Sequence, residues 1–168
     1  MMALYPGTFD PITRGHLDIV ERAAGIFDGL ELAVVMESGK ELCFSADERL
    51  SLARSSVREA GLDDRVEVTL FDGLLVEYMR RRNLRVFIRG LRATSDFEYE
   101  FQMQLMNRRL APEITGIYLM PAENNMYISS TLVREIARYR GDLSSFVMPS
   151  VESALRRRMG EGAPTDRT

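Results

Sequence analysis

The side chains best suited to chemistry begin near the N-terminus, where an apolar run at residues 2–5 leads into a loop with two prolines and two glycines. The loop ends at Gly15 and His16, and His16 is the only histidine of the chain. Glycine lets a backbone come close to a ligand, and the free N–H groups in the first turn of a helix bind anions. A histidine beside them can donate a hydrogen bond to a phosphoryl oxygen. The loop therefore predicts a phosphate-binding site.

Basic and hydroxyl side chains follow apolar runs further along the chain. Lys40 comes after the second run, Arg89 and Arg92 flank Gly90 after the fourth, and the run Ser129-Ser130-Thr131 stands at the expected start of a helix. The carboxyl ends of parallel strands meet at one edge of a sheet, so we expect these groups to gather there. Such a set suits the binding of several phosphates and in-line phosphoryl or nucleotidyl transfer, which depends on positioning and charge stabilisation.

Each of these residues also has a purely structural interpretation. His16 can simply start a helix, Lys40 can be a solvated loop residue, and Ser129 can be only an N-cap. The arginine runs at residues 80–82 and 156–158 are best interpreted as solvated helix faces, and we assign them no role in binding nucleic acid. For His16 the combination of strand, glycine loop and helix favours the functional interpretation.

The pattern of apolar residues defines the elements that must position these groups. Strands are expected at residues 2–5, 30–36, 65–71, 84–88 and 114–120. Helices are expected from about residue 15, after Ser45, at residues 75–82, after Asp96, at residues 131–139 and at residues 151–159. Ser45 and Glu48 form a capping-box pattern, Asp96 is an expected N-cap, and Gly61 is an expected helix end.

Strands that alternate with helices of this length predict right-handed crossovers and a parallel sheet. The fold class is therefore α/β: an open, Rossmann-like, five-stranded parallel sheet with helices on both faces and further helices at the C-terminus. We expect one domain at residues 1–159 and a loose tail at residues 160–168, which is polar and rich in small residues.

Composition narrows the class of protein. The chain has 168 residues, of which 45% are hydrophobic and 28% charged, as in globular proteins. Its net charge of −3 argues against bulk attraction to nucleic acid or anionic lipid. A single cysteine provides no disulfide framework and no cysteine metal cluster. We expect no secretion signal, no membrane association and a cytoplasmic location.

Four motifs, taken together, identify a family. They are YPGTFDPITRGH at residues 5–16, IRGLR at residues 88–92, DFEYE at residues 96–100 and ISSTLV at residues 128–133. Thr13-x-Gly15-His16 alone resembles the (His/Thr)-x-Gly-His signature of the nucleotidyltransferase superfamily. The complete set, in this order and at these separations, resembles the bacterial phosphopantetheine adenylyltransferases over residues 2–159.

The resemblance implies a reaction, in which ATP and 4′-phosphopantetheine give dephospho-coenzyme A and pyrophosphate. It implies that His16, Lys40 and Arg89 stabilise the transition state during direct in-line attack. It further implies that Thr8, Lys40, Leu75 and Arg89 bind phosphopantetheine. The ATP contacts that it implies are Thr8, Phe9, His16, Gly90, Leu91, Arg92, Glu100, Asn125, Met126, Tyr127, Ile128, Ser129, Ser130 and Thr131.

The resemblance also carries expectations about cofactors and partners. Mg²⁺ is expected to be bound mainly through ATP phosphates, with no dedicated protein metal site. A homohexamer is expected, and coenzyme A is expected as a feedback ligand at the active site. The chain departs from the family pattern where Glu37, Ser38 and Gly39 precede Lys40 without a proline, and where Asn125 stands near a position that is often aromatic.

Two other hypotheses are compatible with the same fold. One is a different nucleotidyltransferase, such as a nicotinate-nucleotide adenylyltransferase or a cytidylyltransferase, against which the IRGLR and DFEYE motifs argue. The other is a non-catalytic nucleotide-binding module, because fold alone does not determine function. The presence of His16, Lys40, Arg89 and Arg92 together favours an enzyme.

Overall fold

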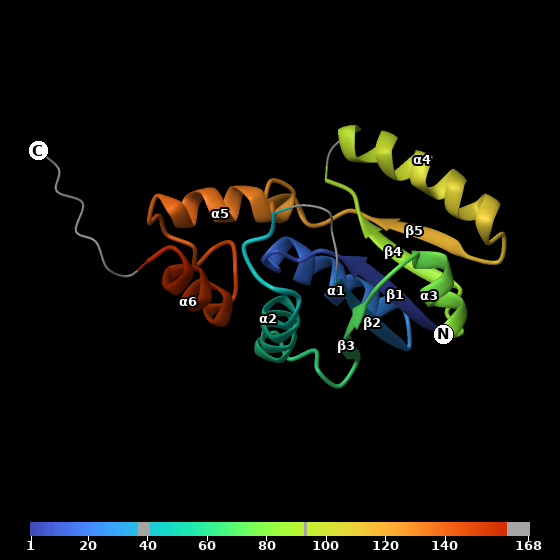
Figure 1. Cartoon of the computed structure of the whole chain (residues 1–168), viewed down its shortest axis with the longest axis horizontal. Coiled ribbons are helices and arrows are strands. Elements are labelled where there is room, and N and C mark those ends of the chain that lie inside the picture. Colours follow the sequence, from blue (N-terminus) through green and yellow to red (C-terminus); the bar gives the residue numbers. More distant parts are fainter. Residues whose placement is uncertain (37–40, 93, 161–168) are drawn as a thin grey trace, which may run out of the picture.

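Five parallel strands and the helices between them form the molecule (Figure 1). The structure is a computed structural model, and it describes residues 1–36, 41–92 and 94–160. The strands are β1 (Met2–Gly7), β2 (Gly29–Val35), β3 (Val66–Phe71), β4 (Val86–Gly90) and β5 (Thr115–Leu119). The helices are α1 (Arg14–Ile26), α2 (Ala46–Glu59), α3 (Leu75–Arg81), α4 (Thr94–Leu110), η1 (Glu123–Asn125), α5 (Ser130–Arg138) and α6 (Pro149–Arg158).

The sheet has the strand order β3-β2-β1-β4-β5, and all of its pairs are parallel. The chain builds outward from β1 to β3 and then crosses to the other side of β1 to add β4 and β5. The strand order therefore reverses between β1 and β4, where Leu4 lies opposite Phe87. Ligands of open α/β sheets bind beside such a switch point, at the carboxyl ends of the strands. The predicted fold class is confirmed.

Alternate residues of the strands point to two apolar cores. Ala3 and Tyr5 of β1 belong to the larger core, which α1, α2, α5 and α6 cover. Leu4 and Phe87 belong to the smaller core on the opposite face, which includes residues of α3 and of the segment that follows α4. Figure 1 shows α5 and α6 at one end of the molecule and α4 beyond the sheet at the other. Strands with both faces covered in this way read as nearly continuous apolar runs.

Local capping residues define where several helices begin and end. Ser45 accepts a hydrogen bond from the Glu48 backbone N–H, and the Glu48 carboxylate accepts one from Ser45 N–H, so the expected capping box is present. Gly61 adopts a φ of 69°, the left-handed conformation that commonly ends a helix. Ser129 caps α5 by accepting from Leu132 N–H at 3.1 Å.

Two sequence-based expectations about the helices are wrong in detail. Asp96 is not an N-cap, because α4 already begins at Thr94; Thr, Ser and Asp all cap helices well, so the sequence could not choose among consecutive candidates. Helix α6 begins at Pro149 itself, since proline fits the first helical position.

No helix in the described parts of the chain combines the length and the apolar character needed to cross a membrane.

Candidate active site

The loop between β1 and α1 places His16 by a local capping arrangement. Thr13 is the N-cap of α1, and its side-chain oxygen accepts from His16 N–H at 3.3 Å. The His16 ring returns the contact, because its Nδ1 accepts from Thr13 N–H at 3.0 Å. A backbone N–H can only donate, so Nδ1 carries no proton and the neutral ring holds its proton on Nε2. His16 therefore offers an Nε2–H donor to the cavity that it lines.

The surroundings of His16 keep the ring neutral. Burial lowers its pKa to about 3, and the charges of Arg92 and Arg89 act in the same direction. The ring also meets Phe9 edge-on, with centroids 5.1 Å apart. A neutral imidazole at physiological pH can donate a hydrogen bond to a phosphoryl oxygen, whereas it brings no positive charge of its own.

At the end of β4, Arg89 is held by a carboxylate from α4. Its Nε lies 2.9 Å from Glu100 Oε1, and its Nη2 lies 2.6 Å from the same oxygen. Its Nη1 donates to the Pro6 carbonyl at 2.9 Å. Burial opposes the charged form, but the hydrogen bonds and charge of Glu100 leave the pKa of Arg89 raised. Arg89 is therefore a permanently charged, oriented group beside the end of β1.

The N-terminus of α5 closes the opposite wall. Ser130 Oγ donates to the Pro11 carbonyl at 2.8 Å, which fastens α5 to the β1–α1 loop. Arg92 reaches the same region, where its Nη1 donates to the Ile128 carbonyl at 3.1 Å. Gly15 lets this segment approach α1, because a Cβ at that position would lie 3.2 Å from the Asn125 carbonyl oxygen. The first-turn amides of a helix, together with a guanidinium, can bind an anion.

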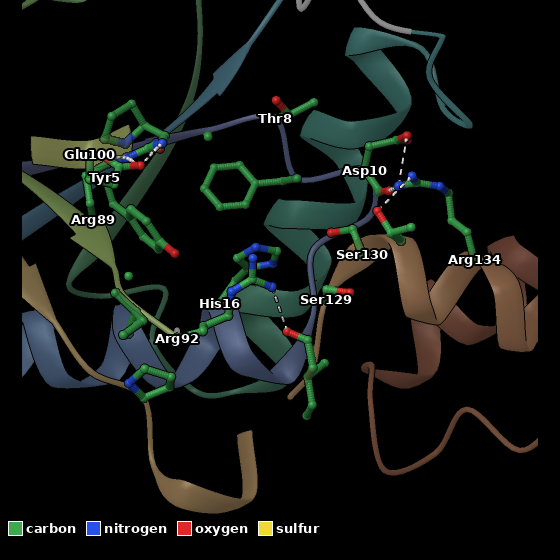
Figure 2. Close-up of a pocket in the computed structure, with 18 of the residues that line it drawn as sticks. Tyr5, Thr8, Asp10, His16, Arg89, Arg92, Glu100, Ser129, Ser130 and Arg134 are labelled. Atoms are coloured by element: carbon green, nitrogen blue, oxygen red, sulfur yellow. Dashed lines mark hydrogen bonds and ion pairs between the residues drawn. The ribbon is translucent and has the colours of Figure 1, made fainter. Parts of the chain in front are cut away.

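These walls enclose a main cavity of about 490 Å³. Figure 2 shows Tyr5, Arg89 and Glu100 on one side of it and Asp10, Ser130 and Arg134 on the other, with His16 between them. A second cavity of about 260 Å³ is lined by apolar side chains that include Val35, Phe71, Leu75, Phe87 and Met103. Thr8, Arg89, Tyr99 and Glu100 line both cavities. The arrangement can hold a polyphosphate beside a second ligand that has an extended, partly apolar arm.

Comparison with known proteins identifies the family. The family model for cytidylyltransferase-like proteins matches residues 4–136. A phosphopantetheine adenylyltransferase from Thioalkalivibrio sulfidiphilus is 52% identical over 160 residues, covering 95% of this chain and 99% of that protein. Those from Methylobacillus flagellatus and Azoarcus sp. are 52% and 51% identical, over 92% and 94% of this chain and 95% of each relative.

The chain belongs to the phosphopantetheine adenylyltransferase family.

Solved structures of more distant proteins share the fold. A Vibrio parahaemolyticus protein described as a nicotinate-nucleotide adenylyltransferase aligns with a TM-score of 0.70 at 19% identity, over 92% of this chain and 97% of its own. Plasmodium falciparum nicotinic acid mononucleotide adenylyltransferase aligns with a TM-score of 0.71 at 13% identity, over 93% and 94%. At such identities the likeness supports the fold of this family member and not its substrate.

The structure brings together many of the residues assigned from the family resemblance, and their roles stay predictions. The main cavity is lined by Thr8, Phe9, His16, Arg89, Gly90, Arg92, Glu100, Ile128, Ser129, Ser130 and Thr131, and the second cavity by Leu75. Lys40 lies outside the described residues.

Four residues expected to contact ATP are not among those that line the main cavity, namely Leu91, Asn125, Met126 and Tyr127. The Asn125 side-chain amide instead donates to Asp18 Oδ2 at 3.3 Å. The ring of Tyr127 packs edge-on against Phe146, with centroids 6.4 Å apart. The contacts of Asn125 and Tyr127 in this structure thus hold the segment before α5 in place.

Three residues that the sequence did not mark as functional shape the site. Asp10 is 3% exposed, and its carboxylate accepts from the backbone N–H groups of Cys43 and Phe44 at 2.8 and 2.9 Å. Arg134 lines the main cavity and donates to the Asp10 carbonyl. Asp18 accepts from Ala122 N–H and from Asn125, which ties the segment before α5 to α1. The only sequence signal for Asp10 and Arg134 was their position, after β1 and one turn into α5.

Proposed function

We propose that this protein transfers the adenylyl group of ATP to 4′-phosphopantetheine, giving dephospho-coenzyme A and pyrophosphate in the penultimate step of coenzyme A synthesis. Family membership supports this assignment. The structural observation that carries it is the junction of two cavities at Thr8 and Arg89. The polar cavity offers amides, hydroxyls and guanidinium groups for ATP, and the other offers an apolar wall for the pantetheine arm.

In the proposed reaction, a phosphate oxygen of phosphopantetheine attacks the α-phosphorus of ATP in line. A new P–O bond forms as the bond to the bridging oxygen breaks, and pyrophosphate leaves with those electrons. Catalysis then depends on orientation and on donors aimed at the charge that develops. Nε2–H of His16 would donate to an α-phosphate oxygen, and Arg89 and Lys40 would hold the acceptor phosphate. The amides at the start of α5, together with Arg92, would hold the departing pyrophosphate.

We further propose that Mg²⁺ acts with ATP and is bound mainly by phosphate oxygens. Asp10 is a carboxylate at the main cavity, but its two oxygens already accept from the amides of Cys43 and Phe44. Magnesium commonly keeps water ligands and is held by substrate phosphates, so the residues present fit an ion that enters with the nucleotide. Such an ion would neutralise charge on the polyphosphate.

The same reasoning extends to regulation, assembly and location. Coenzyme A contains the pantetheine arm, so it would compete with phosphopantetheine for the second cavity.

The apolar side chains exposed on α4, which include Phe101, Leu105 and Met106, support assembly with further copies of the chain, and we propose a homohexamer. A single cysteine fits the reducing cytoplasm in which we place the protein.

The deciding experiment measures pyrophosphate release by the purified protein with ATP, Mg²⁺ and 4′-phosphopantetheine. Parallel reactions contain nicotinate mononucleotide with ATP, or glycerol phosphate with CTP. We expect pyrophosphate release in the reaction that contains ATP, Mg²⁺ and phosphopantetheine, and none in the two parallel reactions. The proposal is overturned if pyrophosphate is released only with nicotinate mononucleotide, or if none of the acceptors in the panel gives release.

A further inference from the structure

Arg49 is a buried cation that the proposed reaction does not use. It lies in the first turns of α2 and is 1% exposed. Its guanidinium donates to the carbonyls of four residues, at 2.7 Å to Thr8, 2.7 Å to Val35, 3.0 Å to Met36 and 3.2 Å to Phe44. No carboxylate in the described part of the chain accepts a hydrogen bond from it. A buried charge that serves only backbone carbonyls calls for an explanation.

The four carbonyls belong to three segments that meet at the edge of the site. Thr8 follows β1, while Val35 and Met36 are at the end of β2, where the chain leaves the sheet. Phe44 precedes α2. Thr8 and Met36 lie beyond the last ladder pairs of β1 and β2, so the sheet supplies no ladder partner for their carbonyls and the donors must come from elsewhere. Only arginine has five N–H donors in a fixed planar fork, so one side chain can join all three segments.

Asp10 completes the arrangement from the other side. Its carboxylate holds the N–H groups of Cys43 and Phe44, while Arg49 holds the Phe44 carbonyl. The segment at residues 43–44 is thus fixed through both its donors and its acceptors, between the β1–α1 loop and α2. We call this set of contacts the Asp10–Arg49 clamp.

Thr8 is the residue through which the clamp reaches the site. It lines both cavities at their junction, and its carbonyl is fixed by Arg49 at 2.7 Å. A displacement of that carbonyl moves the Thr8 side chain and the amides of the same loop. Misplacement of about 1 Å in a site that works by alignment can reduce the rate about 100-fold.

We propose that Arg49 is a positioning residue for the transfer reaction, which sets the place of Thr8 at the junction of the two cavities without touching substrate. This inference rests on the proposed function, and it deepens it by assigning the alignment of the two substrates to a side chain outside the cavities.

The test compares Arg49→Lys with Arg54→Lys. Arg54 lies on the same helix and donates to the Val68 carbonyl at 3.2 Å, on β3 and away from the cavities. Both variants retain the positive charge. At a temperature well below each melting point, we expect R49K to lower kcat at least about tenfold, with KM for ATP changed by less than about threefold. R54K should keep kcat within about twofold of wild type.

A double-mutant cycle with Thr8→Ala shows whether the effect passes through Thr8. If it does, R49K costs less in the T8A background than in the wild-type background. A kcat unchanged in R49K, or an equal loss in R54K, would reduce Arg49 to a stabilising residue and overturn the proposal. Independent effects of R49K and T8A would overturn it as well.

Two further measurements cover failure of folding and failure of the proposed function. If R49K does not fold, Asp10→Asn is measured in its place, because it loosens the same clamp. An unchanged kcat in D10N overturns the proposal. Amide hydrogen exchange needs no substrate: in R49K or D10N the amides of Cys43 and Phe44 should exchange at least about tenfold faster, with those of α3 unchanged. Wild-type protein that lacks turnover in the same assay refutes the proposed function, whereas the exchange result still tests the clamp.

Discussion

At the scale of single residues, His16 serves the helix and the cavity with different atoms. Its Nδ1 completes the cap of α1 by accepting from Thr13 N–H. This leaves Nε2 as the donor that faces the cavity. Glu or Gln usually occupies this position of a capping box. Histidine makes the same hydrogen bond to the N-cap and in addition places a rigid N–H donor beside the anion site. The neutral ring argues for hydrogen-bond stabilisation of a phosphoryl oxygen and against general-base catalysis.

The protonation state of His16 can be observed directly, because the chain has one histidine. We expect its ring ¹⁵N signals to show the Nε2–H tautomer without titration between pH 5 and pH 8, since burial lowers its pKa to about 3. The unfolded chain should protonate this ring near pH 6.5. Between about pH 6.5 and pH 3 the unfolded state therefore binds more protons, and the contribution of His16 to stability falls as the pH drops.

Urea unfolding of wild type and of a His16→Gln variant tests the same point. The wild type should lose more stability than the variant between pH 7 and pH 5. A ring signal that titrates near pH 6.5 in the folded protein would contradict the neutral donor.

Replacing His16 separates its two contributions. His16→Ala removes the Nε2–H donor and the ring's half of the capping box, while Thr13 can still cap the backbone N–H of residue 16. We therefore expect turnover to fall about 100- to 1,000-fold and stability to fall by up to about 1 kcal/mol. His16→Gln can still accept from Thr13 N–H, so its stability should stay close to that of wild type while turnover falls. ATP affinity, measured by calorimetry, should be largely kept in both variants. Turnover unchanged in both would remove His16 from the reaction.

The Glu100 carboxylate accepts hydrogen bonds from the Arg89 guanidinium, and this ion pair should weaken the binding of a substrate phosphate to Arg89. In Glu100→Gln the carboxylate charge is lost while the side-chain shape is kept. We expect phosphopantetheine to bind about 3- to 10-fold more tightly, because Arg89 then meets the acceptor phosphate without a competing anion. Isothermal titration measures the change, with Glu98→Gln on the exposed side of α4 as the matched control. Weaker binding in E100Q would mean that Glu100 positions Arg89 for the phosphate and does not compete with it.

At the scale of elements, the segment between β5 and α5 is fastened to α1 by Asp18. The carboxylate accepts from Ala122 N–H and from the Asn125 side chain. Asp18→Ala removes both contacts, so we expect a stability loss of about 1–3 kcal/mol and a KM for ATP raised several-fold as the start of α5 loses its position. Arg22→Ala is the control, since it removes only the exposed partner of Asp18 and should change stability by less than about 1 kcal/mol. Equal KM values in wild type and D18A would detach this segment from ATP binding.

Local sequence patterns predicted the elements better than they predicted the contacts between them. Ser45 with Glu48, and the apolar runs of the five strands, act over a few residues, so their outcome is visible in the sequence. The bond from Arg49 to the Thr8 carbonyl joins residues 41 apart in the chain, and an arginine in a helix carries no sign of such a partner. The same holds for Asp10 and Asp18. The ends of the strands predicted the edge of the sheet where the main cavity lies, whereas the residues that hold its loops in place depend on tertiary packing.

At the scale of the whole molecule, the site and the exposed apolar surface lie close to each other. The switch between β1 and β4 brings the end of β1 beside Arg89. Helix α4 follows directly and supplies Glu100 to the site. Yet the same helix leaves large apolar side chains exposed, with Phe97, Phe101 and Leu105 each more than half exposed. Tyr99 of this helix lines both cavities. An assembly that covers α4 would therefore also support the wall of the site.

The proposed assembly predicts a specific defect when α4 is altered. Phe101→Glu combined with Leu105→Glu places two charges on one helix face that subunit contact would bury, where each large apolar side chain contributes about 1.5–3 kcal/mol. Light scattering should give the molar mass of a hexamer for the wild-type protein and a smaller molar mass for the variant. The variant should also have a lower melting temperature. Tyr139→Glu, at a 78% exposed aromatic residue just after α5, is the control and should leave the mass unchanged. A monomeric wild type, or a variant that still forms hexamers, would show that α4 is not the contact between copies. Loss of turnover in the small species at unchanged secondary structure would link assembly to the wall that Tyr99 and Glu100 form.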